Sequence, residues 1–247
     1  DMRSIPTARP DNFGTRETLT SEEFKERAAR DEGGRDQAAN KETFLRNEWG
    51  IRSFGYTSLV VDPPNGKIPE MTAAGKARAA ARDRGTFGTG PFDSFEDFTL
   101  YDRCITRGVL GSTLPVIYGN GLRITQNPSS VAITYEMIHD TRVIPVDGRA
   151  HLDSGVEQYL GNARGRWQGD TLVVETTNFK ARSAYRNANP DTLKLVERFT
   201  RIAPDKVRWS VTVDDPSTWT RPWTFSMPLT ENNNEPLMPY ECHEGNY

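Results

Sequence analysis

The sequence is short of the residues that build several familiar kinds of site. Among its 247 residues there are only two cysteines and three histidines, and the hydrophobic fraction is 35%. No run approaches about 18 consecutive apolar residues, which excludes a membrane-spanning helix. Charge of one sign is not in excess, because 31 basic and 34 acidic residues leave a net charge of -3. Nucleic-acid-binding domains usually show a clear basic excess, so we expect no nucleic-acid partner.

Signatures of common enzyme classes are also missing. The chain has no Gly-x-Ser-x-Gly elbow, no Gly-x-x-x-x-Gly-Lys-Ser/Thr loop and no His-Glu-x-x-His pair. Gly119-Asn120-Gly121 is too short for a dinucleotide fingerprint and lacks a βαβ context. These absences exclude P-loop phosphoryl transfer, Rossmann-type hydride transfer and ordinary serine hydrolases, and we expect no cofactor.

The two cysteines, Cys104 and Cys242, allow two interpretations. A disulfide between them would close a very long loop and stabilise the fold by about 4–5 kcal/mol in the loop-entropy description. Two buried free thiols would instead behave as small hydrophobic side chains. Neither cysteine has a third soft ligand beside it, so we expect no zinc site. The chain opens Asp1-Met2-Arg3 without a basic or apolar leader, as expected of a mature or trimmed form.

The first hundred residues are polar, with three segments of helical character. Residues 20–30 begin with Thr20 as a capping residue and acids in the first turn. Residues 37–47 and the alanine-rich residues 72–84 are the other two, and the last has almost no apolar stripe, so we place it on the surface. Residues 59–61 predict a short strand. We assign residues 1–100 to an N-terminal extension that packs on the rest.

From about Tyr101 the apolar residues recur with a period of two, as in strands. Strands are predicted at residues 122–125, 131–144, 164–167, 171–177, 193–202, 207–213, 219–227 and 238–243. Turns separate them and no βαβ alternation occurs, which indicates an antiparallel sheet that closes on itself or forms a sandwich, and the hairpin-like connections favour closure. We therefore predict a mainly β fold, an antiparallel lipocalin-like barrel of about eight strands over residues 101–247, with the partly helical extension wrapping it or plugging one mouth.

Five segments resemble those of a known family: residues 58–64, 103–108, 136–142, 165–176 and 242–247. They include the motifs SLVVDPP, EMIHDTR, GRWQGDTLVVET and CHEGNY. The family is a large group of uncharacterised bacterial proteins that are often predicted to be exported, and the resemblance covers roughly residues 52–247. It implies a periplasmic or secreted location and no particular reaction. The strand pattern is also similar to that of lipocalin-like barrels, in architecture alone.

The histidines are the first candidates for chemistry, because imidazole is the default proton carrier near neutral pH and a nearby carboxylate fixes its tautomer. Each has such a neighbour in the sequence: His139 before Asp140, His151 two residues before Asp153, and His243 before Glu244.

Residues 136–142 form the strongest single segment. As a helix, Glu136 and His139 would make the Glu-x-x-His pair of dimetal bundles, but the pair occurs once and among β-branched neighbours. As a strand, Glu136, Asp140 and Arg142 would share one face, with His139 on the other. That charged face is either a solvated surface row or the polar lining of a pocket.

Binding candidates come from other predicted strands. Glu197 shares a face with two apolar side chains, so it faces inward and needs a partner, either an arginine that holds the barrel together or a ligand. Trp209 and Trp223 offer aromatic walls for a ligand, or are core residues. Together with Tyr135, these are the expected substrate-binding residues. The chain end, residues 240–247, is either tied down across a pocket mouth or an ordinary tail.

The resulting hypothesis is an exported β-barrel enzyme that uses His/carboxylate acid–base chemistry on a small organic or sugar-like substrate, as a cofactor-independent lyase, isomerase, dehydratase or hydrolase. His139 or His243 would carry the proton, with Arg142 as the anion clamp. The partner acids would be Asp140, Glu136 or Glu244. The alternative is a lipocalin-like binding protein for an apolar small molecule. A His/carboxylate metal site is not favoured, because no two histidines lie at chelating spacing.

Overall fold

The computed structural model describes residues 6–29, 55–81, 92–114, 119, 121–185, 188–234, 236–238 and 240–243. Within them the protein is mainly β, and every pair of neighbouring strands in its two sheets is antiparallel, which confirms the predicted class.

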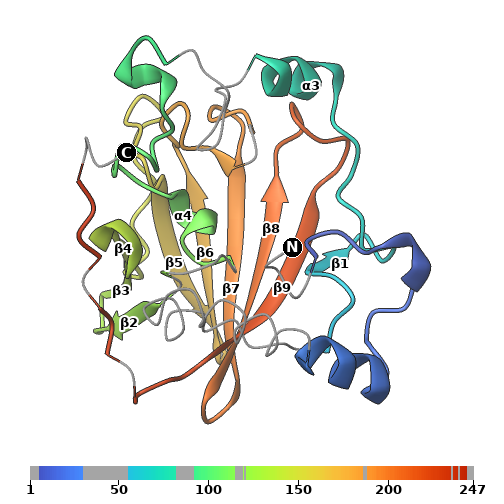
Figure 1. The fold of residues 1–247 in the computed structure, drawn as a ribbon. Coiled ribbons are helices and arrows are strands. Elements are labelled where there is room, and N and C mark those ends of the chain that lie inside the picture. Colours follow the sequence, from blue (N-terminus) through green and yellow to red (C-terminus); the bar gives the residue numbers. More distant parts are fainter. Residues whose placement is uncertain are drawn as a thin grey trace.

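The larger sheet has six strands in the order β1-β9-β8-β7-β6-β5. Their bounds are β1 Val60–Asp62, β5 Asn162–Gln168, β6 Thr171–Thr177, β7 Lys194–Ala203, β8 Lys206–Asp214 and β9 Trp223–Thr230. From β5 to β9 each strand pairs with the next along the chain, so the sheet is a meander (Figure 1). β1 comes from the N-terminal region, close to the short strand predicted at residues 59–61, and it pairs with β9.

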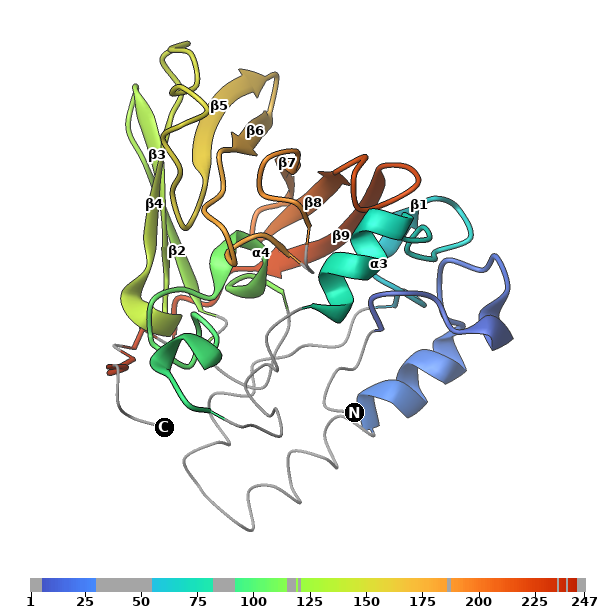
Figure 2. The same cartoon turned by 90° about the horizontal axis from the view of Figure 1, so that it is seen from above.

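The smaller sheet has three strands in the order β2-β3-β4, with bounds β2 Leu122–Gln126, β3 Ser130–Tyr135 and β4 Thr141–Pro145. It stands beside β5, and Figure 2 shows the two sheets together forming an arc. Gly165 of β5 makes the approach possible, because a Cβ there would lie 2.8 Å from Val146 Cγ1 and 2.9 Å from Ile144 Cγ2. The strand pairings of the described residues do not close this arc into a barrel.

The core lies on the inner side of the arc. Along β7, Leu195, Glu197 and Phe199 are buried, whereas Arg198 between the last two is exposed. The indole rings of Trp209 and Trp223 are fully buried and lie 5.4 Å and 5.8 Å from the ring of Phe225. Aromatic side chains bury the largest apolar areas, so these rings contribute heavily to the stability of the fold.

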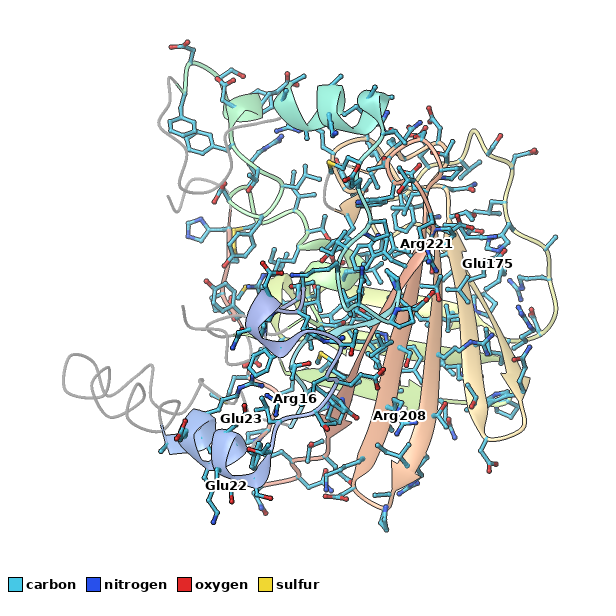
Figure 3. All side chains as sticks on the ribbon, turned by 90° about the vertical axis from the view of Figure 1, so that its right-hand side faces the viewer. Arg16, Glu22, Glu23, Glu175, Arg208 and Arg221 are labelled. Carbon is cyan, nitrogen blue, oxygen red and sulfur yellow. A yellow bond between two sulfur atoms is a disulfide. The ribbon has the colours of Figure 1, made fainter. Side chains whose placement is uncertain are left out.

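The helices are short and lie beside the strands of the two sheets (Figure 2). Residues 21–29 are helical. Thr20 caps them, because its hydroxyl accepts from the Glu23 N–H at 3.2 Å while the Glu23 carboxylate accepts from the Thr20 N–H at 2.8 Å. Figure 3 labels Glu23 and its ion-pair partner Arg16 at this helix. The predicted helix at residues 37–47 lies outside the described residues.

The alanine-rich segment forms α3, Ala73–Ala80, with Thr72 as its capping residue. α4, Gly108–Gly111, lies on the inner side of the arc, where Val109 and Leu110 are buried (Figure 2). Three 3-10 turns complete the elements: η1 Asp11–Phe13, η2 Phe95–Asp97 and η3 Met137–His139. None of the helices in the described part of the chain has the length and apolar character that a bilayer crossing requires.

Three strand predictions need correction. The predicted strand at residues 131–144 is a hairpin, β3 and β4, with η3 between them. The strand predicted from residue 219 begins at Trp223 because Trp219 belongs to the preceding turn, where its N–H donates to the Asp215 carbonyl. Residues 240–243, expected in a last strand, are not extended into a sheet; a disulfide, rather than a strand ladder, fixes them.

Candidate functional site

Four of the predicted site residues meet in a buried polar network on the inner side of the arc. We call it the interior cluster: Tyr135, Arg142, Glu197 and Trp209, with Thr176. Arg142 Nη2 donates to Glu197 Oε2 at 2.5 Å, and Trp209 Nε1 donates to Glu197 Oε1 at 3.1 Å. The side chains of Arg142 and Glu197 are 3% and 1% exposed. The inward-facing Glu197 therefore has the arginine partner that its burial requires.

The electrostatics of the interior cluster favour the ion pair. Burial alone would lower the pKa of Arg142, but the Glu197 carboxylate outweighs it and the pKa is raised, so the guanidinium stays charged. Burial raises the pKa of Tyr135, whose hydroxyl accepts a bond from Arg142 Nη1 at 3.5 Å. Because Arg142 comes from β4 and Glu197 from β7, the pair ties the three-stranded sheet to the six-stranded one.

Three more candidates, Glu136, His139 and Asp140, lie where β3 passes into β4. We call this the loop cluster: Thr106, Glu136, Ile138, His139 and Asp140. Thr106 Oγ1 donates to Asp140 Oδ2 at 2.6 Å and accepts from the Gly108 N–H at 2.9 Å. Asp140 is half-buried, and burial raises its pKa despite the opposing hydrogen bonds from Thr106 and from the Thr141 N–H. The imidazole of His139 is exposed to solvent.

The prediction that residues 136–142 are extended is wrong, and the reason lies in the backbone. Ile138 has a φ of 65° and His139 a φ of 58°, so both are left-handed and reverse the chain. Glu136, Asp140 and Arg142 therefore do not form one charged face. Glu136 is held at the start of the turn, where its Oε2 accepts from the Gly121 N–H at 3.1 Å. Arg142 begins the buried side of β4 instead.

Ile138 and His139 are two adjacent left-handed residues, while the other non-glycine examples among the described residues, Cys104, Asn178 and Arg182, are not adjacent to one another. A left-handed conformation is uncommon for any residue other than glycine and is a genuine outlier for a β-branched one such as Ile138. Each such residue costs of the order of 1–3 kcal/mol, and such residues cluster at sites where function holds the chain in place. Cys104, two residues before Thr106, is a third example with a φ of 52°.

Cys104 and Cys242 form a disulfide, so the first of the two interpretations of the cysteines holds. The bond ties the C-terminal segment, red in Figure 1, to the turn that carries Thr106. His243 follows directly and is exposed. Residues 104–106 thus link the two predicted proton carriers. The disulfide joins Cys104 to Cys242, which precedes His243, and the Thr106 hydroxyl bonds to Asp140, which follows His139. Glu244 lies outside the described residues.

The tryptophans proposed as ligand walls are core residues. Trp223 packs edge-on against Trp219 at 5.6 Å, and Tyr185 lies 6.3 Å from it on another side. Trp209 packs against Phe199 and Phe225. The indole faces therefore contact other rings. The Trp223 Nε1 is buried without a hydrogen-bond partner among the described residues.

Sequence reasoning missed the partner of the third histidine. His151 lies near Glu175 rather than Asp153, with Nε2 at 3.5 Å from Glu175 Oε1. Its Nδ1 is 3.1 Å from Asn162 Oδ1. Figure 3 labels Glu175 on β6, whose outer face it shares with Thr177. No signal local to His151 identifies a partner that lies 24 residues later in the chain, at Glu175 on β6. Thr106 was missed for the same reason.

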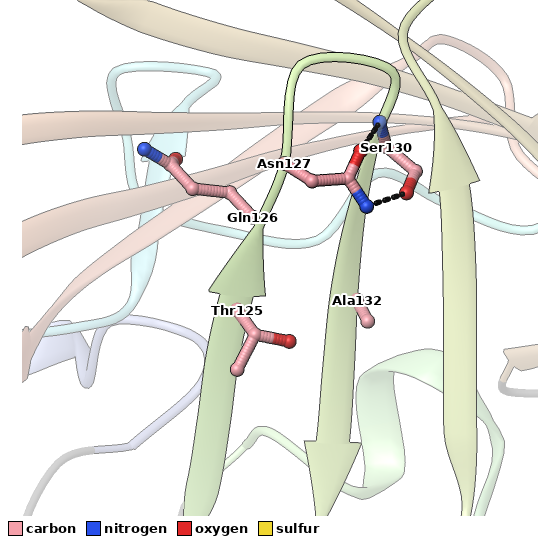
Figure 4. Close-up of a pocket in the computed structure, with 5 residues that line it drawn as sticks. All are labelled: Thr125, Gln126, Asn127, Ser130 and Ala132. Carbon is pink, nitrogen blue, oxygen red and sulfur yellow. Dashed lines mark hydrogen bonds between the residues drawn. The ribbon is translucent and has the colours of Figure 1, made fainter.

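The described surface has two hollows of note. The smaller, about 150 Å³, lies at the β2–β3 turn. There the Asn127 side chain donates to the Ser130 hydroxyl and accepts from the Ser130 N–H (Figure 4). The larger, about 710 Å³, lies at the ends of β6 and β8 and the start of β7.

No group of three or more His, Cys, Asp or Glu side chains within the described ranges could hold a metal ion. Comparison of the chain with protein-family models, with curated proteins and with solved structures gave no match.

Proposed function

We propose that the protein is an exported enzyme that uses His/carboxylate acid–base chemistry on a small organic or sugar-like substrate, as a cofactor-independent lyase, isomerase, dehydratase or hydrolase. The observation that carries the proposal is the strained turn at Ile138 and His139, which holds an exposed imidazole directly before the half-buried carboxyl of Asp140.

The two groups suit complementary roles. Because burial raises the pKa of Asp140, its carboxyl keeps a proton to a higher pH than an ordinary aspartate and can serve as a proton donor. Imidazole is the side chain that enzymes use most often to accept a proton near neutral pH, which assigns that role to His139. Thr106 is a positioning residue, since its hydroxyl fixes the Asp140 carboxyl.

Arg142 has a different role in this proposal from the anion clamp expected from the sequence. The Glu197 carboxylate neutralises its charge in the core. As the first buried residue of β4, Arg142 anchors the strand that directly follows the loop cluster. The enzyme is preferred to a container for an apolar ligand because the rings of Trp209 and Trp223 are packed against other aromatic rings.

The proposal includes a periplasmic or secreted location, in line with the resemblance to predicted exported proteins. The disulfide between Cys104 and Cys242 supports it, because structural disulfides persist in oxidising compartments and are rare in the cytosol. We also propose that the arc is part of a lipocalin-like barrel. The close contact of β4 with β5 at Gly165 and the Arg142–Glu197 pair between the sheets support a continuous wall.

The test is turnover over a panel of 4-nitrophenyl glycosides, 4-nitrophenyl esters and small hydroxy acids, with a pH–rate profile on any substrate found. His139→Ala is expected to lower kcat by about a hundredfold or more, the usual contribution of a positioned acid or base. His243→Ala reports whether the second imidazole takes part. Undiminished turnover in both variants would end the assignment. Native mass spectrometry that finds a co-purified apolar molecule would favour the binding protein instead.

A further inference from the structure

The larger hollow lies apart from the loop cluster, on different elements. It opens where β6 and β8 end and β7 begins, beside the loop that precedes β5, and its volume is about 710 Å³. Its lining has a polar and an apolar part. The polar part is Ser154, Glu157, Thr177, Asn178, Asp191, Thr192, Lys194 and Asp214. The accessible apolar part is Pro190 and Pro216, and the nearly buried Phe179 and Leu193 also belong to the lining.

The loop that forms one wall of the hollow is held by two asparagines, of which Asn178 belongs to the lining. Asn178 Nδ2 donates to the carbonyls of Leu152, Asp153 and Val156, at 3.2, 2.8 and 3.3 Å, and so holds the loop that carries Ser154 and Glu157. Asn162, only 5% exposed, accepts from the Leu152 N–H at 3.0 Å. The wall is therefore fixed before any ligand arrives, which lowers the entropy lost on binding.

The charges at the rim limit the kind of ligand. Lys194 Nζ lies 3.7 Å from Asp214 Oδ2, so the charges of these two side chains neutralise one another. Glu157 and Asp191 are exposed and form no ion pair with the described residues, so the rim repels an anion. Carboxylate oxygens also accept hydrogen bonds from hydroxyl groups of a ligand. The Lys194 ammonium can donate a hydrogen bond to a ligand hydroxyl oxygen.

The volume falls within the roughly 300–1,000 Å³ of pockets that hold drug-sized ligands, but such pockets are usually lined mainly by apolar groups. Here acceptors and donors surround a small apolar floor. That pattern matches a molecule with polar edges and apolar faces. We propose that this hollow binds a neutral saccharide of one or two rings, whose hydroxyl groups bond Glu157 and Asp191. The site stands on its own residues and does not depend on the acid–base function of the loop cluster.

The test is titration of the full chain with maltose, cellobiose and sucrose, followed by calorimetry and by amide NMR shifts. Galacturonate and spermidine serve as the anionic and cationic comparisons. We expect saturable binding of at least one disaccharide, with shifts centred on Thr177, Asn178 and Asp191. Asp191→Asn and Glu157→Gln are each expected to weaken that binding by about tenfold, which corresponds to the loss of roughly 1.4 kcal/mol. Asp170→Asn, an exposed aspartate in the β5–β6 turn, is the matched control and should bind as the unaltered protein does.

Three results would overturn the proposal. The first is the lack of saturable binding by any of the disaccharides at concentrations up to about 100 mM, well above a millimolar dissociation constant. The second is tighter binding of galacturonate or spermidine than of every disaccharide. The third is disaccharide binding that Asp191→Asn and Glu157→Gln leave unchanged while both variants keep the thermal stability of the unaltered protein. Loss of turnover at His139 has no bearing on any of these results.

Discussion

At the scale of single residues, the interior cluster shows how a buried charge is tolerated. Arg142 and Glu197 are nearly inaccessible to water, and each satisfies the other, with Trp209 bonding the second carboxylate oxygen. Removing water from two charges costs several kcal/mol per ion, and the attraction between them offsets this only while both partners are present. Such a pair therefore adds little to the free energy of unfolding when both residues are present, but removing one of them lowers that free energy strongly.

We expect Glu197→Gln to lower the free energy of unfolding by about 3–5 kcal/mol, because it leaves the Arg142 guanidinium buried without a counter-charge. Replacing both residues, Arg142→Met with Glu197→Leu, should restore most of that loss. Urea unfolding curves measure both. The partly exposed Glu175→Gln is the control and should change stability by no more than about 0.5 kcal/mol. A loss below about 1 kcal/mol for Glu197→Gln would show that the pair is not buried as described.

Asp140 and Asp215 predict opposite pH dependences. Burial raises the pKa of Asp140 above the ordinary 3.8, so between 3.8 and the higher folded value the native state binds more protons than the unfolded chain. The contribution of Asp140 to stability therefore falls as the pH rises through that window. Burial also acts to raise the pKa of Asp215, but hydrogen bonds from Thr192, Thr218, Asn189 and Ser217 together lower it below 3.8. Its contribution is present above 3.8 and is lost as the pH falls through the folded value.

Urea unfolding across a pH series tests this pair of signs. Asp140→Asn should gain stability relative to the unaltered protein as the pH rises from about 3 to 7, because the variant has no carboxyl to ionise there. Asp215→Asn should lose relative stability over the same range. Two variants with the same sign of change would contradict the environments described for these carboxyls.

At the scale of elements, the sequence predicts the meander well and the β3–β4 hairpin poorly. β7 and β8 alternate buried and less buried residues over most of their length, and β6 is a short apolar run. Turn residues mark the strand ends, Gly169 between β5 and β6 and Pro204 between β7 and β8, so local pattern is sufficient. Between β3 and β4 the reversal uses Ile138 and His139, neither of which is a typical turn residue. Local propensity therefore predicted one long strand, because nothing in the sequence marks the left-handed turn.

In the candidate site, too, the features set by local pattern could be predicted and those set by tertiary contacts could not. The inward direction of Glu197 and its need for a partner could be predicted from period-two alternation along one strand. Its pairing with Arg142, and the bond from Thr106 to Asp140, join residues 55 and 34 positions apart and depend on how the sheets meet. Contacts of this range are decided by tertiary packing, which no local pattern encodes.

The approach of β4 to β5 gives a test at this scale. Gly165→Ala would place a Cβ within 3 Å of the Ile144 and Val146 side chains, so the two sheets must separate or repack. Overpacking of this kind costs about 1–3 kcal/mol of stability. Gly155→Ala is the matched control, because a Cβ there meets nothing within 4 Å. Thermal unfolding compares the two, and equal midpoints would mean that the sheets do not touch at Gly165.

At the scale of the whole molecule, the disulfide is the one covalent link between distant parts of the described chain. It joins residues 138 positions apart and holds the C-terminal segment against the turn at Cys104. A cross-link stabilises chiefly by restricting the unfolded chain, and natural disulfides are typically worth 2–4 kcal/mol.

The double variant Cys104→Ser with Cys242→Ser should therefore lower the free energy of unfolding by about 2–4 kcal/mol, as measured by urea unfolding without reductant. The unaltered protein in dithiothreitol should show the same loss, which separates the bond itself from the effect of the serines. An unchanged unfolding midpoint in both cases would mean that the cysteines are not bridged in solution.

In the proposed function, the left-handed backbone at His139 is retained because the imidazole is needed there. The most direct test measures the free energy of unfolding and the turnover of His139→Gly together, on whichever substrate the panel identifies. Glycine adopts the left-handed conformation without the strain of about 1–3 kcal/mol, but it loses about 0.5–1 kcal/mol more conformational entropy on folding. Stability should therefore rise by about 0.5–1 kcal/mol. Turnover should fall by about a hundredfold or more. A variant that turns over substrate at the original rate would show that the imidazole is not needed. A variant that is less stable than the unaltered protein would show that the backbone at residue 139 is not strained.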